Sequence, residues 1–289
     1  MIDAHHHFWD PARADYPWLT DELAAIRRPF GPADLAPLIE GAGIDSTVLV
    51  QTRSSLEETV AFLATAAATP FIGGVVGWVD LRDPAVADTI ARLRDGPGGD
   101  RLVAIRHQVH DEADPDWLGR EDVRRGVAAV GRAGLAYDLL VRARELPAAR
   151  GLVAAMPDVR FVVDHLAKPA IRAGDDRPWH DGVAALAGLP NAWWKLSGLV
   201  TEADWQAWRP ADLQPYVDRV LEVAGPDRML FGSDWPVCLL AATYDEVVAT
   251  ARSMIAALTA SEQAAILGRT AAAVYGLALD PGLDPTPRG

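Results

Sequence analysis

The chain has 289 residues, half of them hydrophobic and 23% charged, a balance that allows a large buried core and argues against disorder. Its formal net charge of −13 opposes sequence-independent binding to nucleic acid or to an anionic membrane, because little basic surface is available to displace counterions. A single cysteine, Cys238, excludes an intrachain disulfide, and neither a secretory signal nor a bilayer-spanning apolar run is present, so we expect a cytoplasmic protein that acts on small molecules.

Short β-branched or apolar runs recur along the chain and predict strands. They cover residues 2–7, 46–51, 71–80, 102–109, 135–141, 160–165, 192–199 and 228–234. Helix-like stretches lie between them, at residues 56–68, 84–93, 121–133, 146–155, 179–189, 213–224 and 244–258, and residues 261–276 predict a closing helix. Ser54 and Ser55 ahead of Glu57 and Glu58 are a typical helix start.

Strands that alternate with helices imply parallel strands joined by crossovers. Eight runs spaced roughly 30 residues apart predict one α/β domain, a (β/α)₈ TIM-type barrel over residues 1–289, with residues 280–289 as a Pro/Gly-rich tail. A doubly wound open sheet is the alternative. The longest connection joins the first two strands and includes the aromatic and proline-rich residues 8–19. In a barrel this segment would cover the carboxyl ends of the strands, where active sites lie.

Two histidines near the start of the chain are the first candidates for chemistry. His5 and His7 are two positions apart on a predicted strand, so both side chains point to the same side, the barrel interior, and His6 points the other way. Such a pair can bind a metal or hold a polarised substrate oxygen. Polar packing is the alternative for the pair alone.

Two further candidates end predicted strands. His165 closes the sixth run and either faces a ligand or is a hydrogen-bonded core histidine, while its neighbour Asp164 is expected to face away. Asp234 closes the eighth run, where a buried carboxylate is costly unless it is paired or coordinating. Since the eighth strand of a barrel lies against the first, Asp234 would stand beside His5 and His7, suited to take a proton from water.

Six segments in order resemble one family. They are IDAHHHFWD, GVVGWVDL, IRHQVHDEADPDWL, FVVDHLAKP, WWKLSGLVTEADW and MLFGSDWPVC. Together they resemble the amidohydrolase-2 group of the amidohydrolase superfamily, in the branch that contains L-fuconolactonase, L-rhamnonolactonase and 2-pyrone-4,6-dicarboxylate lactonase. The resemblance runs from residue 2 to about residue 245.

The resemblance implies roles for the four candidates. His5 and His7 match the superfamily's His-x-His, His165 its later strand histidine and Asp234 its eighth-strand aspartate, which acts as general base and then as proton donor. The resemblance implies that these four residues are the ligands of one divalent ion, with zinc preferred. Relatives that work without added metal make a metal-independent site the alternative. The catalytic residues are then Asp234 and His165.

Departures from the family pattern argue against two metals. The fourth run carries Arg106 and His107 where many members have a bridging carboxylated lysine or glutamate, and the fifth offers Tyr137 and Asp138 instead of a histidine. Residues near strand ends are candidates for substrate binding, with surface salt bridges or rim packing as the alternative for each. They are His107, Lys168, Arg53, Arg106, Tyr137, Lys195, Trp9 and Trp235.

We therefore expect a hydrolase that opens a sugar-derived lactone, such as an aldonolactone like L-fuconolactone, to its hydroxy acid with water activated by Asp234. A lactone carbonyl is electrophilic enough for cationic residues to stabilise the oxyanion. The alternatives are a non-oxidative zinc-dependent decarboxylase of the same fold group and a catalytically silent barrel that binds sugar acids. A homo-oligomer is compatible with the sequence.

Overall fold

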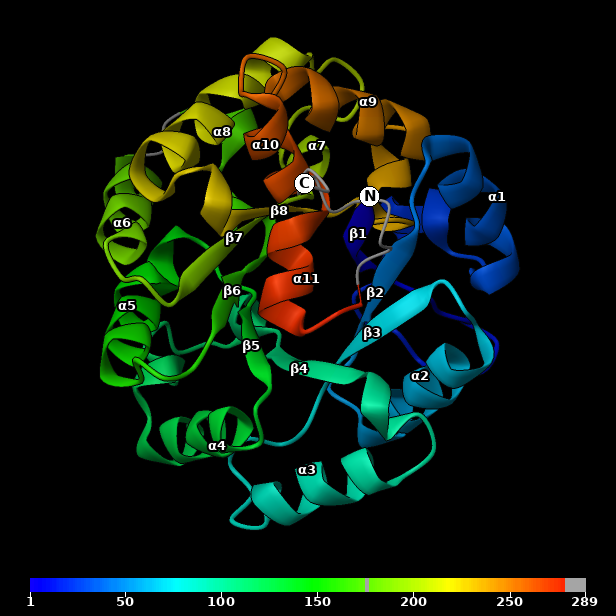
Figure 1. Cartoon of the computed structure of the whole chain (residues 1–289), viewed down its shortest axis with the longest axis vertical. Coiled ribbons are helices and arrows are strands. Elements are labelled where there is room, and N and C mark those ends of the chain that lie inside the picture. Colours follow the sequence, from blue (N-terminus) through cyan, green and yellow to red (C-terminus); the bar gives the residue numbers. More distant parts are fainter. Residues whose placement is uncertain (175–176, 279–289) are drawn as a thin grey trace, which may run out of the picture.

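The computed structural model describes residues 1–174 and 177–278 (Figure 1). Within them one eight-stranded parallel sheet runs in the order β1 to β8. The strands are β1 Ile2–His6, β2 Ser46–Val50, β3 Ile72–Gly77, β4 Leu102–His107, β5 Ala136–Leu139, β6 Phe161–Val163, β7 Ala192–Leu196 and β8 Met229–Phe231. The tail expected at residues 280–289 lies outside the described residues.

The sheet closes on itself next to β1. Residues that follow β8 pair with β1 in a parallel bridge between His6 and Trp235. The backbone N–H of His7 donates to the carbonyl of Trp235 at 2.7 Å, and that of Asp234 donates to the carbonyl of His5 at 2.8 Å. The predicted (β/α)₈ barrel is confirmed, and the open-sheet alternative is wrong.

Helices surround the barrel in the order expected. They are α1 Pro32–Ala42, α2 Leu56–Ala68, α3 Val86–Asp95, α4 Glu121–Arg132, α5 Leu146–Ala155, α6 Arg177–Ala187, α7 Leu199–Glu202, α8 Pro210–Ala224 and α9 Tyr244–Met254. The predicted bounds of α2 and α5 are confirmed. Helix α1 was not predicted, although Pro32 at its first turn and the left-handed Gly43 that ends it are typical helix boundaries.

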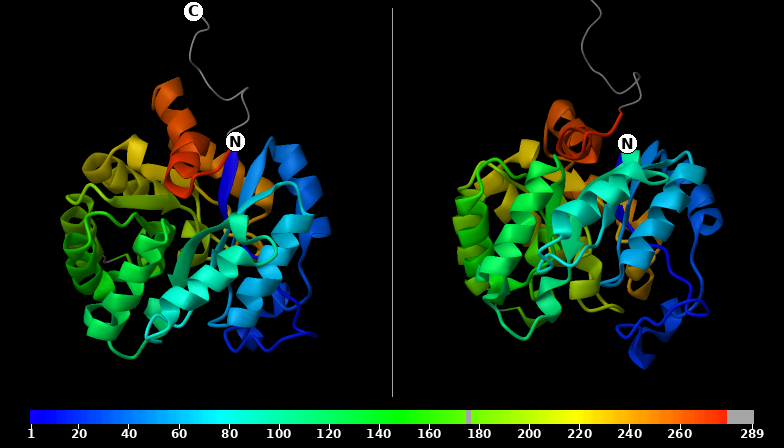
Figure 2. Two further views of the ribbon diagram at one scale, coloured as in Figure 1. Left: turned by 60° about the horizontal axis from the view of Figure 1, so that its bottom comes forward. Right: turned by 90° about the horizontal axis from the view of Figure 1, so that it is seen from below.

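Residues 260–275 close the amino end of the barrel. The expected closing helix is present as α10 Ala260–Ala264, one π-helical turn at Ala265–Arg269 and α11 Thr270–Tyr275. Figure 1 shows α11 lying across the middle of the barrel, and Figure 2 shows it at the end where the N-terminus lies. Ala271 and Tyr275 pack with interior strand residues such as Val48 and Val76. A ligand must therefore enter from the carboxyl end.

No helix in the described part of the chain combines the length and the apolar character needed to cross a membrane.

Candidate active site

A β-bulge in β1 turns the two histidines into the barrel. Asp3 pairs with Thr47 but His6 pairs with Leu49, so β1 carries one residue more than β2 over this stretch. Ile2 and Ala4 face the interior, and strict alternation would send His6 inwards. The extra residue reverses the phase: His6 faces outwards with its Nε2 2.9 Å from Thr47 Oγ1, and His5 faces the barrel.

The four residues expected from the sequence lie together at the carboxyl end of the barrel. The Nε2 atoms of His5 and His7 are 3.1 Å apart. Asp234 Oδ1 lies 3.3 Å from His7 Nε2, 3.7 Å from His5 Nε2 and 3.9 Å from His165 Nε2. All four side chains are buried. One carboxylate is thus ringed by three imidazoles.

The backbone after β6 is left-handed, and this corrects one expectation. Strand β6 ends at Val163, and every residue from His165 to Lys168 has a positive φ, between 47° and 63°. Asp164 keeps the alternation of β6, in which Val162 faces the interior and Val163 the helices, and so faces the interior. The left-handed backbone turns His165 inwards beside it, so Asp164 does not face away. Asp234 is also left-handed, at a φ of 57°. Such backbone costs of order 1–3 kcal/mol per residue and gathers at functional sites.

Buried charges beneath the histidines are paired with one another. Asp164 Oδ2 accepts from Arg106 Nη1 at 2.9 Å, and Asp164 Oδ1 forms an ion pair with Lys195 Nζ at 2.8 Å and lies 3.4 Å from His5 Nδ1. Burial alone would raise the pKa of Asp164, but Lys195, His5 and Arg106 lower it well below its ordinary value. Asp164 is therefore an ionised carboxylate that orients the His5 ring.

Hydrogen bonds decide which nitrogen of His7 carries its proton. His7 Nδ1 lies 2.8 Å from the carbonyl of Val50, which can only accept, so Nδ1 is protonated and the Nε2 lone pair faces His5 and Asp234. Burial lowers the pKa of His5 well below its ordinary value and that of His165 to about 4. Burial would raise the pKa of Asp234, but His165, His7 and His5 hold it well below its usual range. At neutral pH an ionised Asp234 carboxylate meets the neutral imidazoles of His5 and His165.

The donor set fits one divalent cation. The ligand atoms of His5, His7 and Asp234 lie within 4.8 Å of one another, as do those of His5, Asp164 and His165. The His7 lone pair at 3.1 Å from His5 Nε2 requires a proton or a cation between the two nitrogens. Imidazole nitrogen and carboxylate oxygen are ligands that zinc prefers. Without metal, a proton on His5 Nε2 completes the same contact.

A cavity of about 660 Å³, including its mouth, opens above these residues. It is lined by His7, Trp18, Leu23, Thr52, Arg106, Gln108, His110, Asp111, Leu140, His165, Lys168, Asp234 and Val237. Arg106 and Lys168 are the predicted substrate contacts that line it. His110 was missed, because the chain leaves β4 in a 3₁₀ turn at Val109–Asp111 where strand alternation no longer applies. Trp18 belongs to the segment expected to cover the strand ends.

Three of the predicted substrate-binding residues contact other residues of the barrel wall instead. His107 accepts at Nδ1 from Trp78 Nε1 at 3.0 Å, lies 2.7 Å from Glu112 and stacks on another indole. Tyr137 points to the helices and packs edge-on against Phe161. Lys195 is fully buried beneath the cavity. None of the three lines the cavity, so these expectations are corrected. Strand alternation turns the side chains of His107 and Tyr137 outwards, and two carboxylates hold the Lys195 side chain below the cavity.

The remaining three lie beside the site. Arg53 bonds to Glu58 and lies over the Tyr16 ring, facing a neighbouring surface groove that Trp9 also lines. Trp9 and Trp235 are buried and pack against Phe30. They support the segment over the strand ends and do not line the cavity, in line with the packing alternative.

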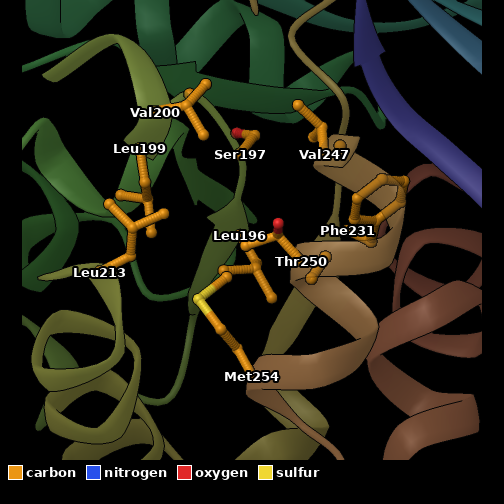
Figure 3. Close-up of a pocket in the computed structure, with 12 residues that line it drawn as sticks. Leu196, Ser197, Leu199, Val200, Leu213, Phe231, Val247, Thr250 and Met254 are labelled. Carbon is orange, nitrogen blue, oxygen red and sulfur yellow. The ribbon is translucent and has the colours of Figure 1, made fainter. Parts of the chain in front are cut away.

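A separate apolar hollow lies on the helix side of β7 and β8 (Figure 3). Side chains of Leu196 and Phe231 face Leu213 of α8 and Met254 of α9 across it. It touches the active site through Ser197, Gly198 and Gly232, and none of the described residues that line it is charged. It offers no chemistry of its own.

Comparison with known proteins places this geometry in a family. A family model described as amidohydrolase matches residues 2–277. The chain belongs to the amidohydrolase family. It is 40% identical over 287 residues to an L-fucono-1,5-lactonase of Burkholderia multivorans, covering 96% of each protein. It is also 40% identical over 248 residues to an L-fucono-1,5-lactonase of Burkholderia ambifaria, covering 85% of this chain and 83% of that protein.

A solved amidohydrolase structure extends the comparison to three dimensions. A crystal structure from Burkholderia multivorans with bound zinc superimposes with a TM-score of 0.91 at 40% identity, covering 96% of this chain and 99% of that one. The amidohydrolase resemblance drawn from the six segments is confirmed.

Proposed function

We propose that this amidohydrolase opens an uncharged sugar-derived lactone, of the L-fucono-1,5-lactone type, to its hydroxy acid. The names of its 40% identical relatives support the reaction class. The observation that carries the proposal is the ionised Asp234 carboxylate at the floor of the cavity, ringed by the imidazoles of His5, His7 and His165.

In the proposed mechanism Asp234 accepts a proton from water, and the water oxygen forms a bond to the lactone carbonyl carbon. The bond from that carbon to the ring oxygen then breaks, and Asp234 returns the proton to the leaving oxygen. Arg106 lines the cavity, keeps its ion pair with Asp164, and supplies a fixed positive charge near the oxyanion without leaving that partner. A zinc ion held by His5, His7 and Asp234 would supply Lewis-acid polarisation of the carbonyl.

Charge pairing around the cavity favours an uncharged substrate. Arg106 is held by Asp164, and Lys168 lies 2.5 Å from Glu202. Among the described residues that line the cavity, these are the arginine and the lysine, and neither is free to bind a substrate carboxylate. Leu23, Leu140 and Val237 add apolar wall. This chemistry suits a hydroxylated lactone ring better than a dicarboxylate.

The test is a pH-indicator assay over a panel of aldonolactones, with carbon dioxide release measured in parallel. Asp234→Asn keeps the shape of the side chain but loses the base, so kcat should fall by about 100- to 10,000-fold. The exposed carboxylate of Asp181 gives the control variant, Asp181→Asn, which should keep full activity. Binding without turnover by the wild type, or carbon dioxide release, would overturn the proposal.

A further inference from the structure

A lysine lies at the centre of the barrel, below the cavity and out of reach of any ligand in it. The side chain of Lys195 on β7 is 0% exposed. Its Nζ lies 2.5 Å from Asp138 Oδ2 and 2.8 Å from Asp164 Oδ1, and 3.3 Å from His5 Nδ1. These partners come from β5, the turn after β6 and β1. One ammonium therefore ties four parts of the barrel together.

The ammonium acts on the site through Asp164 and His5. Asp164 is shared between Lys195 and Arg106, and its Oδ1 is 3.4 Å from His5 Nδ1. A buried carboxylate that loses one of its two cations shifts towards the other, because an unpaired buried charge is strongly unfavourable. Such a shift, together with the loss of Lys195 Nζ at 3.3 Å from His5 Nδ1, changes the contacts that hold the His5 ring. The position of His5 Nε2 beside Asp234 thus depends on the Lys195 charge.

The far side of the same network reaches the closing helix. Tyr275, the last residue of α11, donates its hydroxyl to Asp138 at 2.8–3.0 Å from the two carboxylate oxygens. Its ring centre lies 5.5 Å from Lys195 Nζ. Tyr275 and Asp138 are fully or almost fully buried. The helix that plugs the amino end therefore braces the cation that faces the active site.

We propose that Lys195 is a positioning residue, whose buried ammonium holds Asp164 and His5 in the arrangement that hydrolysis needs, with Tyr275 bracing it through Asp138. The turnover part of this inference rests on the proposed lactonase activity. The Lys195 charge is internal to the protein, so removing it should impair the chemical step and leave substrate binding nearly unchanged.

Variants of Lys195 separate charge from packing. Lys195→Met keeps most of the side-chain volume without the charge, and kcat should fall about 100-fold with little change in KM, the scale of loss that a misplacement near 1 Å causes. Lys195→Ala leaves a space the size of propylammonium. Protein refolded with propylammonium chloride should regain activity several-fold, whereas potassium chloride at equal concentration should not restore it. Lys195→Met should show no rescue.

A milder variant tests the brace and guards against failure to fold. Tyr275→Phe removes one hydroxyl far from the cavity, and kcat should fall about 5- to 10-fold as one hydrogen bond to a charged group is lost. The matched control is Tyr137→Phe, because Tyr137 is an equally buried tyrosine whose hydroxyl has no partner in the described structure. A purely structural role would lower Tm in these variants while kcat of the folded protein stayed unchanged, and that result would overturn the inference.

Crystal structures keep this test separate from the proposed function. The His5 ring should be displaced from Asp164 in Lys195→Met, or in Tyr275→Phe if the first variant does not fold, and should return in Lys195→Ala with propylammonium. An undisplaced ring would overturn the positioning role even if the wild type hydrolyses lactones. A wild type without lactone turnover would sink the proposed function, and the displaced ring would still support the positioning role.

Discussion

The outward-facing histidine of β1 should make stability fall in mild acid. His6 is fully buried, its Nε2 is 2.9 Å from Thr47 Oγ1, and its Nδ1 has no partner within the described residues. Burial, helped by the neighbouring His7, lowers its pKa from 6.5 to about 3. Below pH 6.5 the unfolded chain therefore binds a proton at this position that the folded protein does not, so stability is fully present above pH 6.5 and is lost as pH falls towards 3.

The size of the effect follows from the same numbers. At pH 5 the unfolded-state group is 1.5 units below its pKa of 6.5, and at about 1.36 kcal/mol per unit this one histidine removes about 2 kcal/mol of stability. His6→Gln places an amide where it can still bond to Thr47 but cannot titrate. Urea unfolding at pH 7 and pH 5 should show a difference about 2 kcal/mol smaller in the variant. Equal differences in both proteins, with equal m-values, would refute the reasoning.

Three further predictions concern the site itself. Gly198→Ala and Gly276→Ala both force a left-handed residue, at φ of 65° and 67°. Gly276→Ala should cost about 1 kcal/mol in urea unfolding, and Gly198→Ala should cost more because of its contacts. Only Gly198→Ala should also lower kcat, because its new Cβ would overlap His165 Nδ1, whereas nothing lies within 4 Å of a Cβ at Gly276. Equal kcat values in the two variants would contradict the contact between Gly198 and His165. Zinc added to metal-free protein should raise Tm in the wild type and not in His7→Ala, and a shift of the same size in both would exclude this donor set. Glu202→Gln removes the carboxylate that pairs with Lys168. The kcat/KM for a lactone that bears a carboxylate should then rise about tenfold relative to that for an uncharged lactone. An unchanged ratio of the two values would argue that charge pairing does not determine which substrates the cavity accepts.

Long-range periodicity made the barrel predictable from sequence, and the six motif segments indicated its family by resemblance. Alternating strand and helix patterns need only the average behaviour of many residues, and the ends of β1 and β8 are neighbours in any closed barrel. His5 and Asp234 could therefore be expected side by side before their contacts were known. Their catalytic and metal-binding roles stay proposals that the variants above test.

Local irregularities of the backbone could not be predicted from the sequence pattern. The bulge in β1, the left-handed run from His165 and the 3₁₀ turn that carries His110 each break the two-residue alternation. Asp164 was expected to face away for this reason, and Tyr137 was expected at the site although alternation turns it outwards. A positive φ at a non-glycine residue cannot be read from the amino-acid composition of a segment. The wrong predictions therefore lie at the positions where strained backbone and candidate function coincide.

The closure of the barrel also has a consequence in time. Asp3 of β1 accepts the backbone N–H of Ser233, a contact that spans 230 positions of the chain. During synthesis the paired histidines of β1 are made long before Asp234, and Tyr275 is made later still. Closure of the barrel must therefore wait for contacts between residues far apart in the sequence, and such contacts form slowly. A chain that ends before Asp234 lacks the carboxylate of the candidate site, so the candidate site and the closed barrel form together.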